Sequence, residues 1–481
     1  MYRLNQNETP LLDAMKKYAQ KDVVALDVPG HKRGKGVTIL NEFFGENLMR
    51  LDTNSLPELD HAGKPTGVIK DAQELLADAY GAKKAFFVSN GSTAAIQMML
   101  MSVLSPGDKI LLPKNIHKSA LNGLILAGGI PVYMKPEICI KEGLIKNVSV
   151  KEIKSQLDAH PDAKAVFILN PTYFGYVSEL KKIADLCRER KVFLLADEAH
   201  GAHFPFHEEM PPSAMACGAH MSAVSVHKTG GALTQASALL VGSDEIDIHR
   251  VKQVVNILQS TSVSYLLMGS LDGARYNLVQ HGKEQLENAL ALSKRARMEI
   301  NGINGLSAPF EENHMDPTKL IINVTGLTLT GFEFYELLWK EHHIQLELCE
   351  NNHVLAIISL GDDKQTIDRL VATLKDVAKK YLRSDSEGHL LLEPLIQDAI
   401  VCLSPRDAYY SKSELVKLED AIGRVSAESI MAYPPGIPIV SPGELITAPI
   451  VQILKDLKAK NAFIVDNQDP ELKEILVVVK E

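Results

Sequence analysis

The chain has 481 residues, of which 46% are hydrophobic and 23% are charged. These values are typical of a folded, soluble globular protein, and the length allows roughly two to four domains, so a disordered chain or a disulfide-stapled mini-protein is excluded. The chain carries 51 Lys and Arg against 60 Asp and Glu, a formal net charge of −9. An acidic balance of this kind argues against a nucleic-acid partner.

Five cysteines are present, and none forms a CxxC pair. The sequence therefore predicts neither a disulfide framework nor a thiolate metal site, and it favours a reducing compartment. The N-terminus has no apolar signal core, and the apolar stretches at 94–104 and 119–133 are shorter than the about 20 residues that a spanning helix needs. We expect a cytoplasmic protein with no membrane segment and no metal.

Helices and short buried strands alternate in the first half of the chain. A predicted helix over 67–80 ends at Gly81 and is followed by a strand over 85–88, a polar turn and a second helix. Apolar strands that alternate with helices predict an α/β fold with a parallel sheet, whose ligands bind beyond the carboxyl ends of the strands. The same unit recurs, with strands expected at 109–112, 131–134, 165–169 and 192–196 and a helix at 178–190.

The pattern changes after residue 280. A long helix over 282–300 is predicted there, followed by a strand at 319–324, a helix at 331–341 and a strand at 353–359, which indicates a smaller α+β unit. The last part of the chain is rich in Pro and Gly at 433–438 and 441–444. We predict four segments: an N-terminal segment (1–60), a large domain (61–280), a small α+β domain (281–384) and a C-terminal domain (385–481).

Lys228 is the first candidate for chemistry. It lies between a predicted strand and the glycine pair that ends Ser225–Gly231, 31 residues after Asp197. A lysine alone in such a place is more often a surface residue. Its functional interpretation is a lysine that forms a Schiff base, and the residues around it decide between the two.

Four further features point to one cofactor. The turn at Asn90–Thr93 joins a strand to a helix, so Ser92, Thr93 and their backbone N–H groups could seat a phosphate, although a simple helix cap is as compatible. Asp197 ends a buried strand and could pair with a protonated ring nitrogen, or it could cap a helix. His117 could stack on an aromatic ring, and Ser225 adds a second hydroxyl near the phosphate. Together with Lys228, these parts are what a pyridoxal phosphate site requires.

On these residues the chain resembles the bacterial pyridoxal-phosphate-dependent ornithine/lysine/arginine decarboxylases, and it looks closest to their short members, often called arginine decarboxylases. The resemblance implies a large domain of the aspartate-aminotransferase type (fold type I) with a mixed, mostly parallel sheet. The motifs that carry it are Val28–Lys32, Asn115–Ser119, Asn170–Gly175, Asp197–Gly201, Ser225–Lys228 and Tyr433–Glu444.

The resemblance also implies roles for individual residues. Lys228 would hold the cofactor, Asp197 would bind its ring nitrogen, and His117 would stack on the ring. A second subunit would reach the phosphate through Thr261 and Ser262, so we expect a homodimer or a higher homo-oligomer with its active site at the subunit interface. This chain has Val263 where the family commonly has proline, which weakens the last assignment. The phosphate itself would be served by Ser92, Thr93, Ser225 and His227.

The expected reaction is decarboxylation of a basic L-amino acid. The group that protonates Cα stays open between Lys228 and His200, and His200 could equally orient Asp197 or the cofactor. Glu444, in the rigid loop that closes the Pro-rich motif, is our candidate for binding the distal cation of the substrate, with a helix N-terminal glutamate as the alternative.

The substrate is ranked by resemblance alone. We place arginine first, giving agmatine and carbon dioxide, then lysine and then ornithine, with polyamine synthesis or an acid response as the context. An aminotransferase of the same fold is the competing enzyme class, and Arg406 and Arg424 are the nearest candidates for gripping an α-carboxylate. A scaffold or regulator without activity would be expected to lack Lys228 or Asp197, and both are present.

Overall fold

The computed structural model describes residues 2–384, 398–432, 437–459 and 464–479. The chain forms two compact units, one made of residues 1–102 and 196–283 and the other of residues 103–195 and 284–481. We call them unit 1 and unit 2. The predicted α/β class with a mixed, mostly parallel sheet is confirmed. No helix in the described ranges is long and apolar enough to cross a membrane.

Unit 1 contains three strands that pair antiparallel: β1 (Lys84–Val88), β8 (Met221–Val224) and β9 (Ser237–Val241). Strand β9 pairs antiparallel with β1 on one side and with β8 on the other, and every residue of β9 is buried. The elements of this unit are α1 (Pro10–Gln20), α2 (Thr38–Phe44), α3 (Glu46–Leu51), α4 (Val68–Ala79), β1 (Lys84–Val88), α5 (Gly91–Val103), α9 (Ala214–Cys217), β8 (Met221–Val224), α10 (Val226–Thr229), β9 (Ser237–Val241) and α11 (Ile248–Leu258).

A buried ion pair ties the N-terminus of unit 1 to the first half of helix α12 (Tyr265–Asn301). Arg275 Nη2 lies 2.7 Å from Asp272 Oδ1, and both side chains are fully buried. Arg275 also donates to the carbonyl of Gln6 at 2.8 Å, and Asp272 accepts from the N–H of Leu11 at 3.0 Å. Each buried charge therefore has an ion-pair partner and a hydrogen bond to the backbone near the start of α1, as buried charges require.

Helix α12 is longer than the sequence predicts, since it begins at Tyr265 and not at residue 282. Three glycines, at 269, 273 and 282, make this stretch look unlike a helix, because glycine is a poor helix former. Two of them allow α1 to approach closely. A Cβ on Gly269 would lie 2.7 Å from the sulfur of Met15, and one on Gly273 would lie 3.3 Å from Leu12.

Unit 2 contains parallel strands: β2 (Lys109–Pro113) pairs in parallel with β3 (Ile130–Met134) and with β6 (Ala165–Leu169). Each of these strands agrees with the sequence prediction within one residue. Strand β7 (Phe193–Glu198) crosses the boundary between the two units. The neighbouring elements of unit 2 are α6 (Lys118–Ala127), β4 (Ile138–Cys139), β5 (Leu144–Ile145), α7 (Val150–Ala159) and α8 (Leu180–Arg190).

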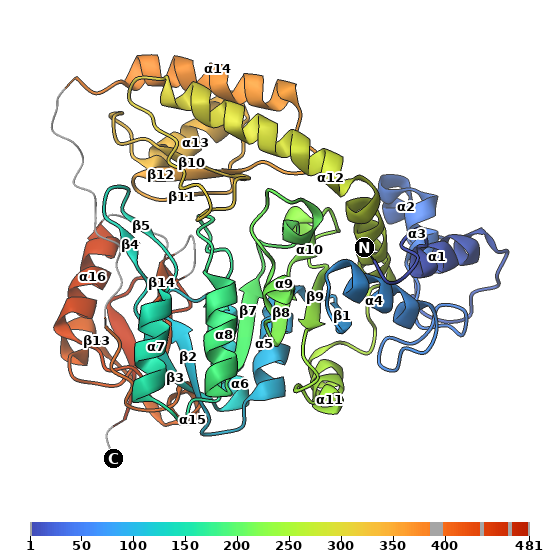
Figure 1. Cartoon of the computed structure of the whole chain (residues 1–481), viewed down its shortest axis with the longest axis horizontal. Coiled ribbons are helices and arrows are strands. Elements are labelled where there is room, and N and C mark those ends of the chain that lie inside the picture. Colours follow the sequence, from blue (N-terminus) through green and yellow to red (C-terminus); the bar gives the residue numbers. More distant parts are fainter. Residues whose placement is uncertain (1, 385–397, 433–436, 460–463, 480–481) are drawn as a thin grey trace. The chain divides into compact units, whose positions relative to one another are not determined.

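The predicted α+β part of unit 2 is a three-stranded antiparallel sheet with helices. The strands β10 (Lys319–Asn323), β12 (His353–Ile357) and β11 (Leu348–Cys349) stand in that order. The second half of α12 lies beside α14 (Lys364–Tyr381), held by Arg295–Asp368 at 2.8 Å (Figure 1). Helix α13 (Gly331–His342) begins at a capping box made by Thr330 and Glu333.

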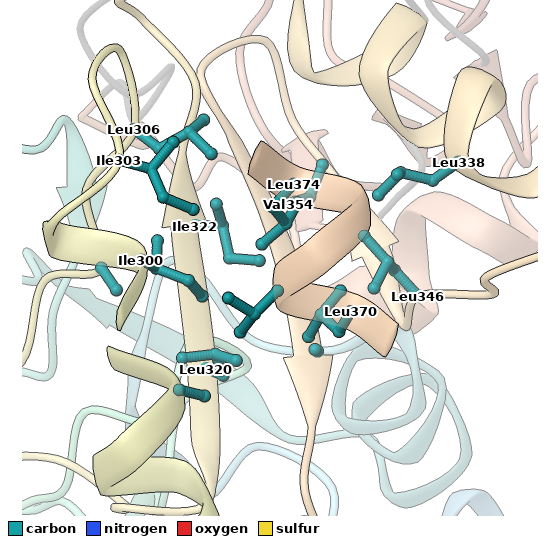
Figure 2. Packing of buried hydrophobic residues seen from close by; sticks show 14 of the residues in the cluster. Ile300, Ile303, Leu306, Leu320, Ile322, Leu338, Leu346, Val354, Leu370 and Leu374 are labelled. Atoms are coloured by element: carbon teal, nitrogen blue, oxygen red, sulfur yellow. The ribbon is translucent and has the colours of Figure 1, made fainter. Parts of the chain in front are cut away.

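Apolar side chains from these helices and strands meet in one core. Figure 2 shows residues of α12, β10, β12, α13 and α14 pointing toward one another between the sheet and the helices. Ile300, Ile322, Val354 and Leu374 are at most 1% exposed. Burial of this kind is the main stabilising term for such a layer, at about 25 cal/mol per Å² of apolar surface.

The C-terminal part of unit 2 has its own small core. Strand β13 (Ser413–Lys417) pairs with β17 (Glu474–Val478), and β14 (Ile430–Ala432) lies between β15 (Ile437–Val440) and β16 (Ile464–Val465). Helices α15 (Pro405–Tyr410) and α16 (Ala448–Ala459) complete it. The predicted motif residues Tyr433, Pro434, Pro435 and Gly436 lie outside the described residues.

Candidate active site

Asp197 lies near the end of β7 and is 6% exposed. Its Oδ1 accepts a hydrogen bond from the N–H of Ala199 at 3.0 Å, which fixes the carboxylate against the turn after the strand. Burial raises the pKa of Asp197, while the Ala199 hydrogen bond and the positive charge of Lys228 act in the opposite direction. A buried carboxylate of this kind calls for a cationic partner.

Lys228 lies in the single turn α10, directly after β8. Its N–H donates to the carbonyl of Ser225 at 3.1 Å, and its side chain is exposed. The Nζ atom of Lys228 lies 3.0 Å from Nε2 of His200, and His200 is 5% exposed. The structure therefore brings together the amine, the imidazole and the carboxylate that the sequence predicted separately.

Two hydroxyls meet at the start of helix α5. Ser225 Oγ donates to Ser92 Oγ at 2.7 Å, and Ser225 is fully buried. Gly91, the first residue of the helix, has φ +75°, and Thr93 is exposed in the first turn. Because the first N–H groups of a helix have no partner within it and carry the positive end of the dipole, this corner suits a phosphate group.

His227 is half-buried and faces the loop before β9. Its backbone N–H donates to the carbonyl of Ala236 at 3.1 Å, and its Nδ1 lies 3.2 Å from the same oxygen. Burial lowers the pKa of His227, and the positive charge of Lys228 lowers it further. A neutral imidazole that donates from Nδ1 leaves Nε2 as an acceptor.

These residues of unit 1 fit pyridoxal phosphate. Asp197 offers a buried carboxylate for a ring nitrogen, Lys228 an amine for the aldehyde, and Ser92 with Ser225 a hydroxyl pair for the phosphate. Among the described residues, the hydroxyl of Thr229, next to Lys228, is also buried and has no hydrogen-bond partner. Within the described residues, no cluster of His, Cys, Asp and Glu is arranged to hold a metal ion.

Thr261 and Ser262 lie apart from this group. Both are exposed in the loop after α11, and the N–H of Ser262 donates to Ser260 Oγ at 3.1 Å. In the part of the chain that the structure describes, neither side chain is hydrogen-bonded to Ser92 or Lys228. Their predicted role depends on a second copy of the chain and stays a prediction.

Two predicted residues lie in unit 2. His117 caps helix α6, where its Nδ1 accepts from the N–H of Ser119 at 3.2 Å. Glu444 is 1% exposed, and its Oε1 and Oε2 lie 2.5 and 2.6 Å from Nζ of Lys114. Both oxygens of the carboxylate that we predicted for the substrate are therefore paired within the chain.

Sequence reasoning missed Lys114, although a signal was present. Lys114 directly follows the apolar strand Lys109–Pro113, a place where lysine is uncommon because its charge is rarely buried. In the structure Lys114 is 4% exposed. It also missed the structural role of Glu198, whose carboxylate accepts from Ser222 Oγ at 2.6 Å and from the N–H of Ala214 at 2.8 Å. Nothing in the sequence indicates those partners.

The two arginines considered for an aminotransferase are engaged in other contacts. Arg424 lies 2.6 Å from Glu414 and donates to the carbonyl of Val478 at 2.9 Å. Arg406 donates to the carbonyl of Leu126 at 3.3 Å. Arg424 therefore already has a carboxylate partner, which makes it a poor receptor for the α-carboxylate of a substrate.

Comparison with known proteins gives consistent matches over nearly the whole chain. Residues 9–310 match the family model described as Orn/Lys/Arg decarboxylase, major domain, and residues 396–465 match the Orn/Lys/Arg decarboxylase, C-terminal domain. An arginine decarboxylase of Bacillus anthracis is 39% identical over 468 residues, which cover 95% of each chain. An arginine decarboxylase of Halalkalibacterium halodurans is 41% identical over 450 residues, 92% of each chain.

A solved structure extends the likeness to the fold. Lysine decarboxylase A from Pseudomonas aeruginosa superposes with a TM-score of 0.85 at 22% identity, over 98% of this chain and 80% of that chain. At this level of identity the match shows a shared fold, and it leaves the substrate open.

Proposed function

The chain belongs to the Orn/Lys/Arg decarboxylase family, and from this membership we propose that it is a pyridoxal-phosphate-dependent carboxy-lyase that converts L-arginine to agmatine and carbon dioxide. The observation that carries the proposal is the grouping of Asp197, His200 and Lys228 in unit 1. Nζ of Lys228 lies 3.0 Å from His200, and its positive charge acts on the buried Asp197.

Lys228 would hold the cofactor through Nζ, and Asp197 would pair with its ring nitrogen. When bound, pyridoxal phosphate supplies the electron sink that accepts the electron pair left behind as carbon dioxide departs. Asp197 keeps its place because Ala199 donates to Oδ1 at 3.0 Å. The hydroxyls of Ser92 and Ser225, with the N–H groups that follow Gly91 in the first turn of α5, would bind the phosphate, since the N–H of Gly91 already donates to the carbonyl of Gln235 at 3.0 Å.

A proton must be delivered to Cα after carbon dioxide leaves. His200 and Lys228 are the two candidates, and the 3.0 Å separation of Nε2 and Nζ allows a proton to pass between them. His200 is held in a buried position, so it can also orient the lysine amine. Replacing His200 with Gln should lower kcat by roughly 10²-fold if the imidazole moves the proton.

The substrate follows from the relatives at about 40% identity, whose names specify arginine. Steady-state kinetics on arginine, lysine and ornithine, with carbon dioxide and 2-keto acid measured in the same samples, test the proposal. We expect carbon dioxide and agmatine from arginine, and a kcat/KM for lysine and ornithine at least tenfold lower. Keto acid without carbon dioxide would instead identify an aminotransferase.

We further propose that the active site is completed by a second copy of the chain. Thr261 and Ser262 are exposed in this chain, and the family resemblance has them reach the phosphate of the neighbouring subunit. His117 would stack on the ring of the cofactor by the same resemblance. We also propose a cytoplasmic location, which agrees with the five cysteines being free of disulfides in the described residues.

A mixing experiment tests the shared site. A Lys228→Ala chain and a Thr261→Asp/Ser262→Asp chain are each expected to be inactive. Random re-association should restore about a quarter of the wild-type activity, because half of the dimers are mixed and one of their two sites is intact. If each variant keeps its own activity level on mixing, the phosphate site is completed within one chain.

A further inference from the structure

Lys114 and Glu444 form a buried ion pair between residues that are 330 positions apart in the sequence. The lysine Nζ lies 2.5 Å from Oε1 and 2.6 Å from Oε2, so the contact is bidentate on the carboxylate. The side chains are 5% and 2% exposed. At this burial, removal of one side chain would leave the other charge without its partner, which is strongly destabilising.

Tyr133, on the neighbouring strand β3, contacts the lysine of the pair. The Nζ of Lys114 lies 4.5 Å from the centre of the Tyr133 ring, which is a cation–π contact. Burial raises the pKa of Tyr133 well above its ordinary value, and the negative charge of Glu444 raises it further. The tyrosine therefore stays a neutral phenol beside the pair.

Glu444 belongs to a loop with little freedom. Its carbonyl accepts from the N–H of Ser426 at 2.9 Å, and its N–H donates to the carbonyl of Ser441 at 3.1 Å. The preceding Gly443 has φ +90°, and a Cβ there would lie 2.2 Å from the carbonyl oxygen of Leu403. The loop therefore presents the carboxylate from a fixed backbone.

Lys114 connects the fixed loop of Glu444 to the segment that carries His117. Its N–H donates to the carbonyl of Met134 at 3.0 Å, and only Asn115 and Ile116 separate it from His117. The imidazole of His117 is in turn held by Ser119 at the first turn of α6. A shift of Lys114 would thus move the histidine at the other end of this four-residue segment.

We infer that Lys114 and Glu444 act as a positioning pair that sets the place of His117. In this role Glu444 affects the reaction through Lys114, and the distal cation of the substrate is bound by another group. This interpretation differs from the sequence expectation that Glu444 binds that cation. It rests on the proposed function, because contact with the cofactor of a decarboxylase is the role that we propose for His117.

A double-mutant cycle on the full-length, cofactor-loaded protein tests the inference. The variants are Lys114→Met, Glu444→Leu and the two combined, which replaces the pair with apolar side chains of similar length. The matched control is Lys118→Met, which removes the exposed pair Lys118–Asp466 (3.2 Å) between the same α6 region and the C-terminal part. Exposed pairs contribute little, so we expect this control to behave as wild type.

Each single variant should lower the midpoint of thermal unfolding and reduce kcat for arginine roughly 10- to 100-fold, with KM changed less than about threefold. The circular dichroism of the bound cofactor should change in the single variants, in the same direction as we expect for His117→Ala. In the double variant the unfolding midpoint, kcat and the dichroism should return toward wild type, because no unpaired charge remains.

The inference is overturned if Glu444→Leu raises the KM for arginine, if the double variant does not recover, and if Lys114→Met keeps its activity. That pattern would assign Glu444 to the substrate. Should the wild-type protein release no carbon dioxide from any basic amino acid, the proposed function fails alone. The unfolding midpoints and the cofactor dichroism would still decide whether the pair positions His117.

Discussion

At the scale of single residues, the candidate site is built from groups whose ionisation is controlled by burial. Asp197 has a raised pKa and His227 a lowered one, and in both cases burial is the first cause. Asp197 is a carboxylate that can pair with a cation, whereas His227, next to Lys228 in the sequence, is an imidazole whose neutral form is favoured. Their effects on stability therefore have opposite signs with pH.

Asp197 should destabilise the cofactor-free protein at neutral pH. A carboxyl whose folded pKa is raised stabilises the fold below its ordinary pKa, and this contribution is lost as the pH rises through the folded value. Asp197→Asn stays neutral and keeps the acceptor for Ala199, so its apoprotein should unfold at a higher temperature than wild type at pH 7. We expect kcat to fall on the order of 10²-fold or more.

Thermal unfolding of apoprotein between pH 4 and 8 measures this difference, with the exposed Asp22→Asn as a control that should show none. Addition of pyridoxal phosphate should stabilise wild type more than Asp197→Asn, since only wild type supplies a charge for the ring nitrogen. Equal stabilisation of both proteins would argue against contact between Asp197 and that nitrogen.

His227 should act in the acidic range. Its folded pKa lies below the ordinary value of about 6.5, so its contribution to stability is present above pH 6.5 and is lost as the pH falls through the folded pKa. His227→Asn should remove this part of the acid sensitivity, measured as unfolding midpoints from pH 7.5 to pH 5. The exposed His249→Asn should leave the pH profile unchanged, and an identical profile for both variants would contradict the assignment.

At the scale of elements, the sequence predicted what depends on local pattern. Strands such as β6 and β1 were located within one residue, because a continuous apolar run between polar turns is a strong signal. The start of α12 was misplaced because glycines at 269 and 273 serve close packing with α1, which is a contact between distant segments. Propensity alone cannot report that contact.

The turn before Glu444 offers a test at this scale. Gly443→Ala must adopt a left-handed backbone, which costs a non-glycine residue roughly 1–2 kcal/mol, and its Cβ would also lie 2.2 Å from the carbonyl oxygen of Leu403. Gly423→Ala has φ +78° and open space around the added Cβ, so it should lose only the backbone contribution. Denaturant unfolding should therefore show Gly443→Ala to be clearly less stable than Gly423→Ala. Equal losses would mean that the loop relaxes without difficulty.

At the scale of the whole molecule, sequence reasoning reached the family and most of the candidate residues. Lys228, Asp197, His200, Ser92 and Ser225 were named from motifs, and the structure groups them in unit 1. The pairing of Lys114 with Glu444 could not be predicted, since it joins residues 330 positions apart. The four contiguous domains predicted from the sequence stay a prediction. The compact units follow another division of the chain, since each is made of two separate stretches.

The net charge of −9 supports one prediction for the entire protein. An acidic surface should attract a cationic amino acid, and salt screens this attraction over about 8–10 Å at physiological ionic strength. We expect kcat/KM for arginine to fall as sodium chloride is raised from low to physiological concentration, while kcat stays constant. A kcat/KM that does not change with salt would exclude electrostatic steering.

The most direct test of Lys228 as the residue that holds the cofactor is to reduce the loaded protein with borohydride and map the labelled peptide by mass spectrometry. Borohydride converts an imine on lysine into a stable amine, so the site is read without any assay of activity. We predict one phosphopyridoxyl group per chain, on Lys228, and none in Lys228→Ala. A label on another lysine, such as the buried Lys114, or an undiminished label in Lys228→Ala, would contradict the assignment.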